Sequence, residues 1–138
     1  MSEQNKTIDR RFFELLKTGD LSVADEIVAL NYVNHNPAHG QAPGREGLKA
    51  FATLFSTAFP DCHFTIEDQI AEGDNVVSRF TMTGTHQSEF AGIPATGKPV
   101  NMTGISIHRV TGGQIQEGWL NFDALGMMQQ LGAIPGGA

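Results

Sequence analysis

The hydrophobic and polar positions in the first part of the chain repeat at helical spacing. Apolar residues three or four apart predict a helix over residues 5–18, and Gly19 is placed to end it. A shorter pattern of the same kind predicts a helix over residues 22–30. An apolar stripe rich in phenylalanine predicts another over residues 44–59, which must pack on an apolar surface.

The period changes to two in the second part of the chain. Alternating residues predict long strands over 62–72, 76–86 and 99–110, and a further strand that starts at Gln114. Gly112 and Gly113 fit a two-residue hairpin turn between the last two strands. Helical spacing then returns for the closing segment, in Leu125, Met128 and Leu131.

This order of elements predicts an α+β fold. Helices that are grouped before a run of antiparallel strands cover one face of the sheet. We expect a strongly curved antiparallel sheet packed on the N-terminal helices, which together form a cone with a cavity inside. The length of 138 residues fits a single domain over 1–138, and no linker or internal repeat interrupts it.

Composition excludes several classes of function. A formal net charge of −6 argues against binding to nucleic acid, and no phosphate-binding glycine loop occurs. His35 and His39 are four apart, but Pro37 lies between them, so no metal site is predicted. We therefore expect neither metal nor cofactor. No apolar run is long enough to span a bilayer, and the N-terminus has no signal-peptide pattern, so a cytoplasmic protein without membrane contact is expected.

The end of the last strand carries the candidate chemistry. Trp119, Asn121 and Asp123 are two residues apart and share one face of that strand. A turn at Gly112-Gly113 would pair Thr111 with Gln114. Continued without a break, that register places four residue pairs opposite each other and adds Met102, Ser106 and His108 to the same face. The pairs are Ser106 with Trp119, Gly104 with Asn121, Met102 with Asp123, and His108 with Glu117.

We take this face as the floor of a ligand pocket, with two roles open for Asp123. It can cap the closing helix, since Asp is a preferred N-cap residue, or it can act as an acid/base group, and the roles are not exclusive. His35, in a short extended piece, is a second histidine that can point inward. Arg79 is a charge in the middle of a strand, either paired with a carboxylate at the surface or placed in the pocket. His86, at the end of a strand, is expected to anchor the following loop by a hydrogen bond.

Several stretches of this chain resemble the SnoaL-like polyketide cyclases. They are GDNVVSRFTMTGTHQSEFAGIPATGKPVNMTGISIHRV, GGQIQEGWLNFDALGMMQQLGAI, YVNHNP, and REGLKAF with FPDCHFTIED. The likeness covers nearly the whole chain. It implies the nuclear transport factor 2-like fold, in which a curved sheet wraps around a pocket, and this agrees with the cone expected from the residue pattern.

The resemblance also implies an activity. Characterised members of the family close a ring of an aromatic polyketide ester by an intramolecular aldol reaction, without metal, cofactor or covalent intermediate. An aspartate near the end of the last strand is their general acid/base, and Asp123 is the matching position, with His35 or His108 as its partner. Trp119, Asn121, Ser106, Met102 and Arg79 would then contact a small, apolar, carbonyl-rich substrate.

Two alternatives to a cyclase remain open. One is a non-catalytic small-molecule-binding or assembly module with the same pocket. The other is an enzyme of the epoxide hydrolase or isomerase type, which the same fold also hosts. In either case apolar residues on both faces of the long strands predict a homodimer that is formed through a sheet face.

Overall fold

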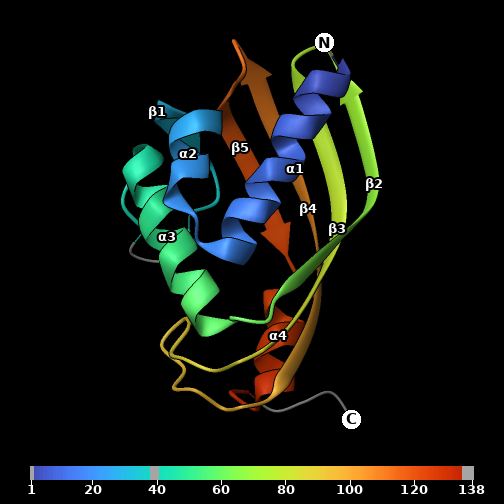
Figure 1. The fold of residues 1–138 in the computed structure, drawn as a ribbon. Coiled ribbons are helices and arrows are strands. Elements are labelled where there is room, and N and C mark those ends of the chain that lie inside the picture. The colour runs from blue at the N-terminus through green and yellow to red at the C-terminus, as the bar shows by residue number, and fades with distance from the viewer. Residues whose placement is uncertain (1, 38–40, 135–138) are drawn as a thin grey trace.

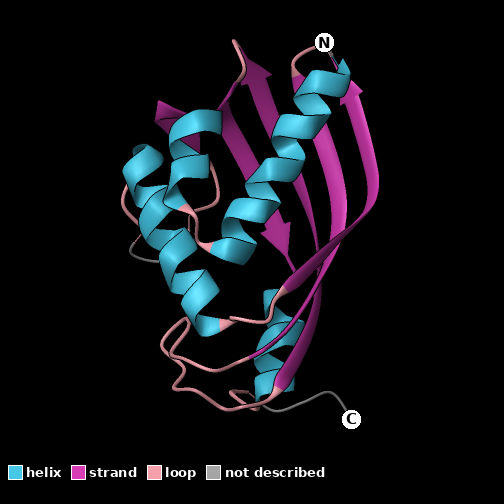
Figure 2. Ribbon diagram, in the orientation of Figure 1, coloured by secondary structure: helices cyan, strands magenta, loops and turns pink. Residues whose placement is uncertain are grey.

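The computed structural model describes residues 2–37 and 41–134. It confirms the predicted α+β class (Figures 1 and 2). The elements, in chain order, are α1 (Ser2–Thr18), α2 (Leu21–Ile27), β1 (Val28–Asn34), α3 (Gly44–Ala58), β2 (His63–Glu72), β3 (Asn75–Thr85), β4 (Pro99–Thr111), β5 (Gln114–Phe122) and α4 (Ala124–Leu131).

Both long helices form where the apolar stripes predict them. The buried residues of α1 include Ile8, Phe12, Leu15 and Leu16. Helix α1 is followed by Gly19 at a φ of +70°, a conformation that glycine adopts without strain. The second helix is shorter than predicted, because the chain is already extended at Val28, which pairs with Ile115 of β5. Strand pairing outweighs the weak helical pattern of those last residues.

The five strands form one sheet in the order β1-β5-β4-β3-β2. Strands β2 to β5 pair with one another in antiparallel fashion, but β1 runs parallel to β5, so the sheet is mixed rather than purely antiparallel as predicted. A parallel pair needs a long connection. Here α3 and the strands β2 to β4 supply it, because they lie between β1 and β5 in the sequence.

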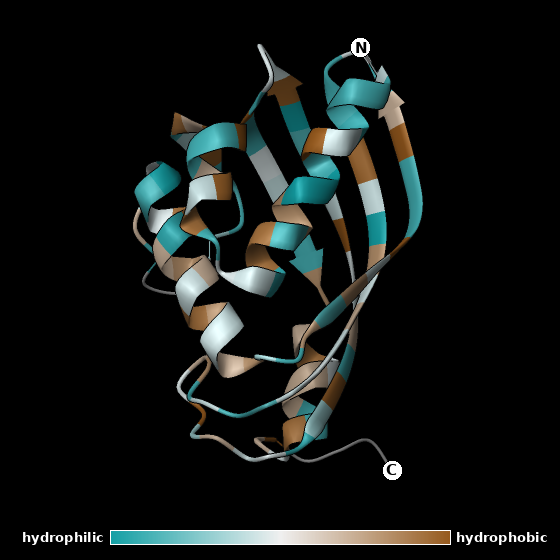
Figure 3. Cartoon of the chain, viewed as in Figure 1, coloured by the Kyte–Doolittle hydropathy of each residue, from teal (hydrophilic) through white to brown (hydrophobic). Residues whose placement is uncertain are grey.

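Helices α1, α2 and α3 lie over the same face of the sheet, and α4 lies at the lower end of the long strands (Figure 1). We call this the helix-covered face and the opposite one the open face. Hydrophobic bands recur along α1 and α3 (Figure 3). The core contains a cluster of phenylalanine rings, with centroids 5.0 to 5.9 Å apart in the pairs Phe13–Phe80, Phe55–Phe64 and Phe59–Phe90.

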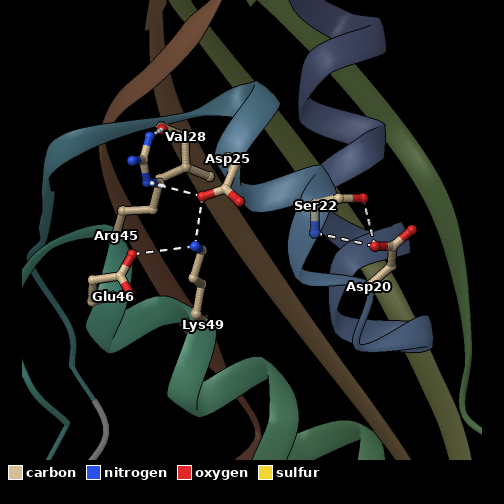
Figure 4. Close-up of polar contacts among 7 residues, drawn as sticks. All are labelled: Asp20, Ser22, Asp25, Val28, Arg45, Glu46 and Lys49. Atoms are coloured by element: carbon tan, nitrogen blue, oxygen red, sulfur yellow. Dashed lines mark hydrogen bonds and ion pairs between the residues drawn. The ribbon is translucent and has the colours of Figure 1, made fainter.

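Ion pairs fix α2 and α3 to each other (Figure 4). Asp25 of α2 accepts from Lys49 and lies 3.6 Å from Nε of Arg45, both on α3. Nη1 of Arg45 also donates to the carbonyl oxygen of Val28, at the start of β1. The hydrogen bond from Lys49 is the main reason why the pKa of Asp25 lies below its ordinary value.

Two smaller predictions about single residues are confirmed. His86 is fully buried, and its Nδ1 lies 3.0 Å from Oγ1 of Thr96, so it anchors the loop after β3 as expected. The hairpin turn has positive φ at Gly112 and Gly113, and Thr111 pairs with Gln114. Among the described residues, no helix is both long enough and apolar enough to cross a membrane.

Gly104 is the tightest point of the sheet interior. A Cβ at this position would overlap the ring of Phe80 and come within 2.8 Å of the carbonyl oxygen of Asn121. We predict that Gly104→Ala lowers the free energy of unfolding by about 1–3 kcal/mol, the usual cost of overpacking a core. Gly84→Ala is the matched control, because a Cβ there approaches its neighbours only to 3.3 Å. Equal melting temperatures for the two variants would contradict this account.

Candidate functional site

The predicted pairing of β4 with β5 is correct only next to the turn. Val110 pairs with Ile115, but Arg109 already pairs with Glu117, so Gln116 has no partner on β4. This is a β-bulge, an extra residue in one strand, and it moves the rest of β5 by one position. The structure therefore replaces the predicted pairs with Ser106–Leu120, Ile107–Trp119, His108–Gly118, Gly104–Phe122 and Ile105–Asn121.

As a result, the residues predicted to share one face lie on both sides of the sheet. Met102, Ser106 and His108 are buried on the helix-covered face. Trp119 pairs with Ile107 and Asn121 pairs with Ile105. Ile105 and Ile107 alternate with the buried residues of β4, so Trp119 and Asn121 lie on the open face. The prediction of a single shared face is wrong. Successive side chains of a strand point to opposite faces, so a shift of one residue in the pairing moves each side chain to the other face.

His108 belongs to a polar cluster beneath α1, which consists of Asp9, Gln69, Ser78, Ser106 and His108. Nδ1 of His108 lies 2.6 Å from Oδ1 of Asp9. The other carboxylate oxygen, Oδ2, accepts hydrogen bonds from Ser78 Oγ and, at 2.9 Å, from Gln69 Nε2. Asp9, Ser78, Ser106 and His108 are all 0% exposed. The polar cluster thus joins α1 to the strands β2, β3 and β4.

Three atoms of the polar cluster have no hydrogen-bond partner among the described residues. They are Nε2 of His108, Oγ of Ser106 and Oε1 of Gln69. Most buried polar groups in proteins are paired, and an unpaired one costs about 1–3 kcal/mol. Ser106 and His108 are two residues apart on the same face, so their α-carbons are roughly 7 Å apart.

Tyr32 and Gly118 complete the surroundings of His108. A Cβ on Gly118 would lie 2.6 Å from Cδ2 of His108, 3.1 Å from its Nε2 and 3.0 Å from the hydroxyl oxygen of Tyr32. Only glycine leaves room for the imidazole and the phenol to approach β5 so closely. Burial raises the pKa of Tyr32, so its hydroxyl stays protonated and can donate a hydrogen bond.

His35 lies in a different place, on the open face. Its ring stacks on the indole of Trp119, with centroids 4.3 Å apart and an angle of 7° between the planes. Nε2 of His35 contacts Glu117 at 3.0 Å, and Glu117 also accepts from Arg109 at 2.9 Å. The hydrogen bonds from His35 and then Arg109 hold the pKa of Glu117 below its ordinary value. His35 and Trp119 are thus neighbours, as predicted, but they lie apart from His108.

Asp123 is the N-cap of α4, as one of its two predicted roles required. It accepts a hydrogen bond from the backbone N–H of Gly126 at 2.9 Å, and its own N–H donates to the carbonyl of Thr103. Its side chain is exposed and lines a shallow depression of about 440 Å³. The other residues that line it are Arg79, Thr103, Gly104, Ile105, Asn121 and Phe122. Asp123 therefore lies with Asn121 and Arg79, but not with Trp119, His35 or His108 in the part of the chain that the structure describes.

Arg79 makes an ion pair at the surface. Its Nε donates to Oδ2 of Asp68 at 2.7 Å, and both side chains are more than half exposed. This is the surface pairing that its position in the strand suggested, and Arg79 also lines the depression beside Asp123. No group of three or more His, Cys, Asp or Glu among the described residues could hold a metal ion. His39 lies outside these residues.

Sequence reasoning missed Asp9, although a signal for it exists. Asp9 is three residues before Phe12 and seven before Leu16, so it lies on the apolar stripe of α1. A carboxylate on the buried face of a helix needs a partner, because burying an unpaired charge is costly. That rule points to an interior polar site, but only the packed structure identifies His108 as the partner.

Comparison with known proteins identifies the family of this chain. The family described as SnoaL-like polyketide cyclase matches residues 6–131. The aklanonic acid methyl ester cyclase DnrD of Streptomyces peucetius is 30% identical over 129 residues, which cover 89% of this chain and 87% of DnrD.

Solved structures agree with this match. IdmH from Streptomyces antibioticus superposes with a TM-score of 0.79 at 36% identity, covering 94% of this chain and 99% of IdmH. TsrD from Streptomyces laurentii gives a TM-score of 0.89 at 28% identity, over 97% of this chain and 98% of TsrD. The curved sheet, the helices on one of its faces and the match along nearly the whole sequence lead to one conclusion: this chain belongs to the SnoaL-like polyketide cyclase family.

Proposed function

We propose that this protein catalyses a cofactor-independent acid/base cyclisation of a small, apolar, carbonyl-rich molecule, with His108 as the group that takes and returns the proton. The observation that carries this proposal is the pair of unpartnered polar atoms, Nε2 of His108 and Oγ of Ser106, on the helix-covered face. Family membership and the name of DnrD, an aklanonic acid methyl ester cyclase, support a ring closure of this type.

The chemistry needs only a base and a hydrogen-bond donor. A carbon between two carbonyl groups loses its proton readily, because the enolate that forms is delocalised. The imidazole takes this proton, and the hydroxyl of Ser106 donates to the enolate oxygen. The enolate carbon then attacks a second carbonyl carbon of the same molecule, so that a C–C bond forms and the attacked oxygen becomes an alkoxide. The imidazolium returns the proton to that alkoxide, and no proton is gained or lost overall.

The apolar surroundings suit such a substrate. Phe12 lies against the imidazole of His108, with ring centroids 4.4 Å apart, and Met102 is on the same face of β4. Hydrogen bonds and charges act more strongly in an interior of low polarity than in water. The same interior could serve a non-catalytic binding module, and variants that bind without turning over the ligand distinguish the two functions.

The alternative of an epoxide hydrolase has less support. That reaction calls for an arginine between two carboxylates, which activate a water molecule together. Among the ion pairs of the described residues, Arg79 has one carboxylate partner, Asp68. Asp123 lines the same depression, but both Arg79 and Asp123 are exposed there.

His108→Gln tests the proposed base. We predict that turnover falls roughly 10²–10⁴-fold, the usual contribution of a positioned acid/base group. The assay follows cyclisation of β-keto esters and aromatic polyketide esters by liquid chromatography. His63→Gln is the control, because His63 is exposed at the start of β2. If His108→Gln keeps wild-type turnover on a substrate that the wild type cyclises, the assignment fails.

Asp123→Asn tests the role that the family resemblance implies for this carboxylate. Asn caps a helix about as well as Asp, so we expect a melting temperature close to wild type. Turnover is predicted to stay within about tenfold of wild type, because the carboxylate caps α4 and lies some five positions along β5 from the partner of His108, or about 16 Å. A loss of 10²-fold or more at an unchanged melting temperature would transfer the acid/base role to Asp123.

We further propose that the protein is a homodimer through the open face. Ile70 and Ile105 are 64% and 51% exposed there, and Ile107 and Trp119 lie beside Ile105 and Asn121 in the pairing of β4 with β5. Exposed apolar patches of this kind mark interfaces. The paired charges Arg109 and Glu117 at one side of the patch can meet their own copies in a two-fold arrangement.

Light scattering at micromolar concentration should give twice the mass of one chain for the wild type. Ile105→Asp should give the mass of a monomer, because the charge would be buried in the interface. Leu54→Asp is the control, since Leu54 is similarly exposed at 44% but lies on α3. A monomeric wild type would rule out the dimer.

A further inference from the structure

Asp9 is an unusual residue for the middle of a buried helix face. Its exposure is 0%, and it lies among Ile8, Phe12 and Phe13 on α1. Its carboxylate accepts from three side chains on three different strands: Gln69 on β2, Ser78 on β3 and His108 on β4. Three donors satisfy most of the acceptor capacity of a carboxylate.

A purely structural link between α1 and the sheet is the simpler explanation of these contacts. Apolar residues of similar size can join two elements equally well, since a buried charged pair adds little net stability. In this structure Nδ1 of His108 is bound tightly, whereas Nε2 is buried and unpartnered.

We propose that Asp9 is a positioning residue that fixes the tautomer of His108. The ionised carboxylate can only accept, so the proton of the neutral imidazole is on Nδ1 and the lone pair is on Nε2. The same contact fixes the direction of the ring, so the lone pair lies on the side of Gly118 and the hydroxyl of Tyr32. The catalytic meaning of this inference rests on the proposed function, but the tautomer itself does not.

Ser78 and Gln69 have a supporting part in this arrangement. Both donate to Oδ2 of Asp9, which leaves Oδ1 for His108. Gln69 is held in turn by a second bond, from its Nε2 to the backbone carbonyl of Lys6 on α1 at 3.0 Å. Both oxygens of the Asp9 carboxylate are thus hydrogen-bonded. A rotation of this carboxylate away from His108 would also break the bonds from Ser78 and Gln69.

Nitrogen-15 NMR of the imidazole rings reports the tautomer directly and needs no substrate. We expect His108 of the wild type at neutral pH to carry its proton on Nδ1, with an unprotonated Nε2. In Asp9→Asn the side-chain amide can donate to Nδ1, so the fraction of the Nε2–H tautomer should rise at least tenfold. Asp25→Asn is the matched control, because Asp25 is a carboxylate with ion-pair partners at the surface, and it should leave the spectrum of His108 unchanged.

A wild-type His108 that is protonated on Nε2 overturns the inference, and so does an unchanged tautomer in folded Asp9→Asn. If Asp9→Asn does not fold, the measurement on the wild type and on Ser78→Ala, which keeps the carboxylate and the expected Nδ1–H form, still decides the matter. The two proposals also fail separately. If His108→Gln turns over normally while the Nδ1–H tautomer is observed, the proposed function is wrong and the positioning of His108 by Asp9 stands.

Discussion

The bulge at Gln116 determines which side chains can meet in this protein. Without the bulge, the pairing that starts with Thr111 and Gln114 at the turn would continue along both strands, and Trp119 would lie opposite Ser106. With it, Trp119 lies opposite Ile107 and belongs to the open face. Every residue of β5 beyond the bulge lies on the opposite face from the one that an unbroken register would give it. Side chains alternate between the two faces, so one inserted residue exchanges the faces for all that follow. The helix-covered face gains Gly118 through this shift, and the missing side chain of Gly118 makes room for His108.

The interior polar cluster is therefore surrounded by small and aromatic residues. Gly118 lies beneath the imidazole, and Phe12 lies against it. A carboxylate and an imidazole in such a place are stable only because each hydrogen bond of Asp9 is made. Because Nδ1 of His108 is bound to Asp9, only Nε2 has no partner among the described residues, and the proposed acid/base role uses that nitrogen.

The open face has the opposite character. Its charges are paired along the surface, as in Arg79 with Asp68 and Arg109 with Glu117, and apolar residues lie between them. Surface ion pairs contribute little to stability. In the proposed dimer they would specify how the second copy approaches. His35 extends this pattern, since it is stacked on Trp119 and bound to Glu117.

The sequence by itself determined the class of fold, the positions of the long helices and strands, the hairpin turn and the family. These follow from patterns local to the chain: apolar spacing, glycine positions and an ordered set of family motifs. It also predicted the cap at Asp123 and the loop anchor at His86. It could not determine the bulge, because Gln116 differs from an ordinary strand residue only in the pairing that β4 imposes. Nor could it join Asp9 to His108, which are ninety-nine residues apart. Only the packing of α1 across the sheet brings these two side chains together, and the candidate site depends on that contact.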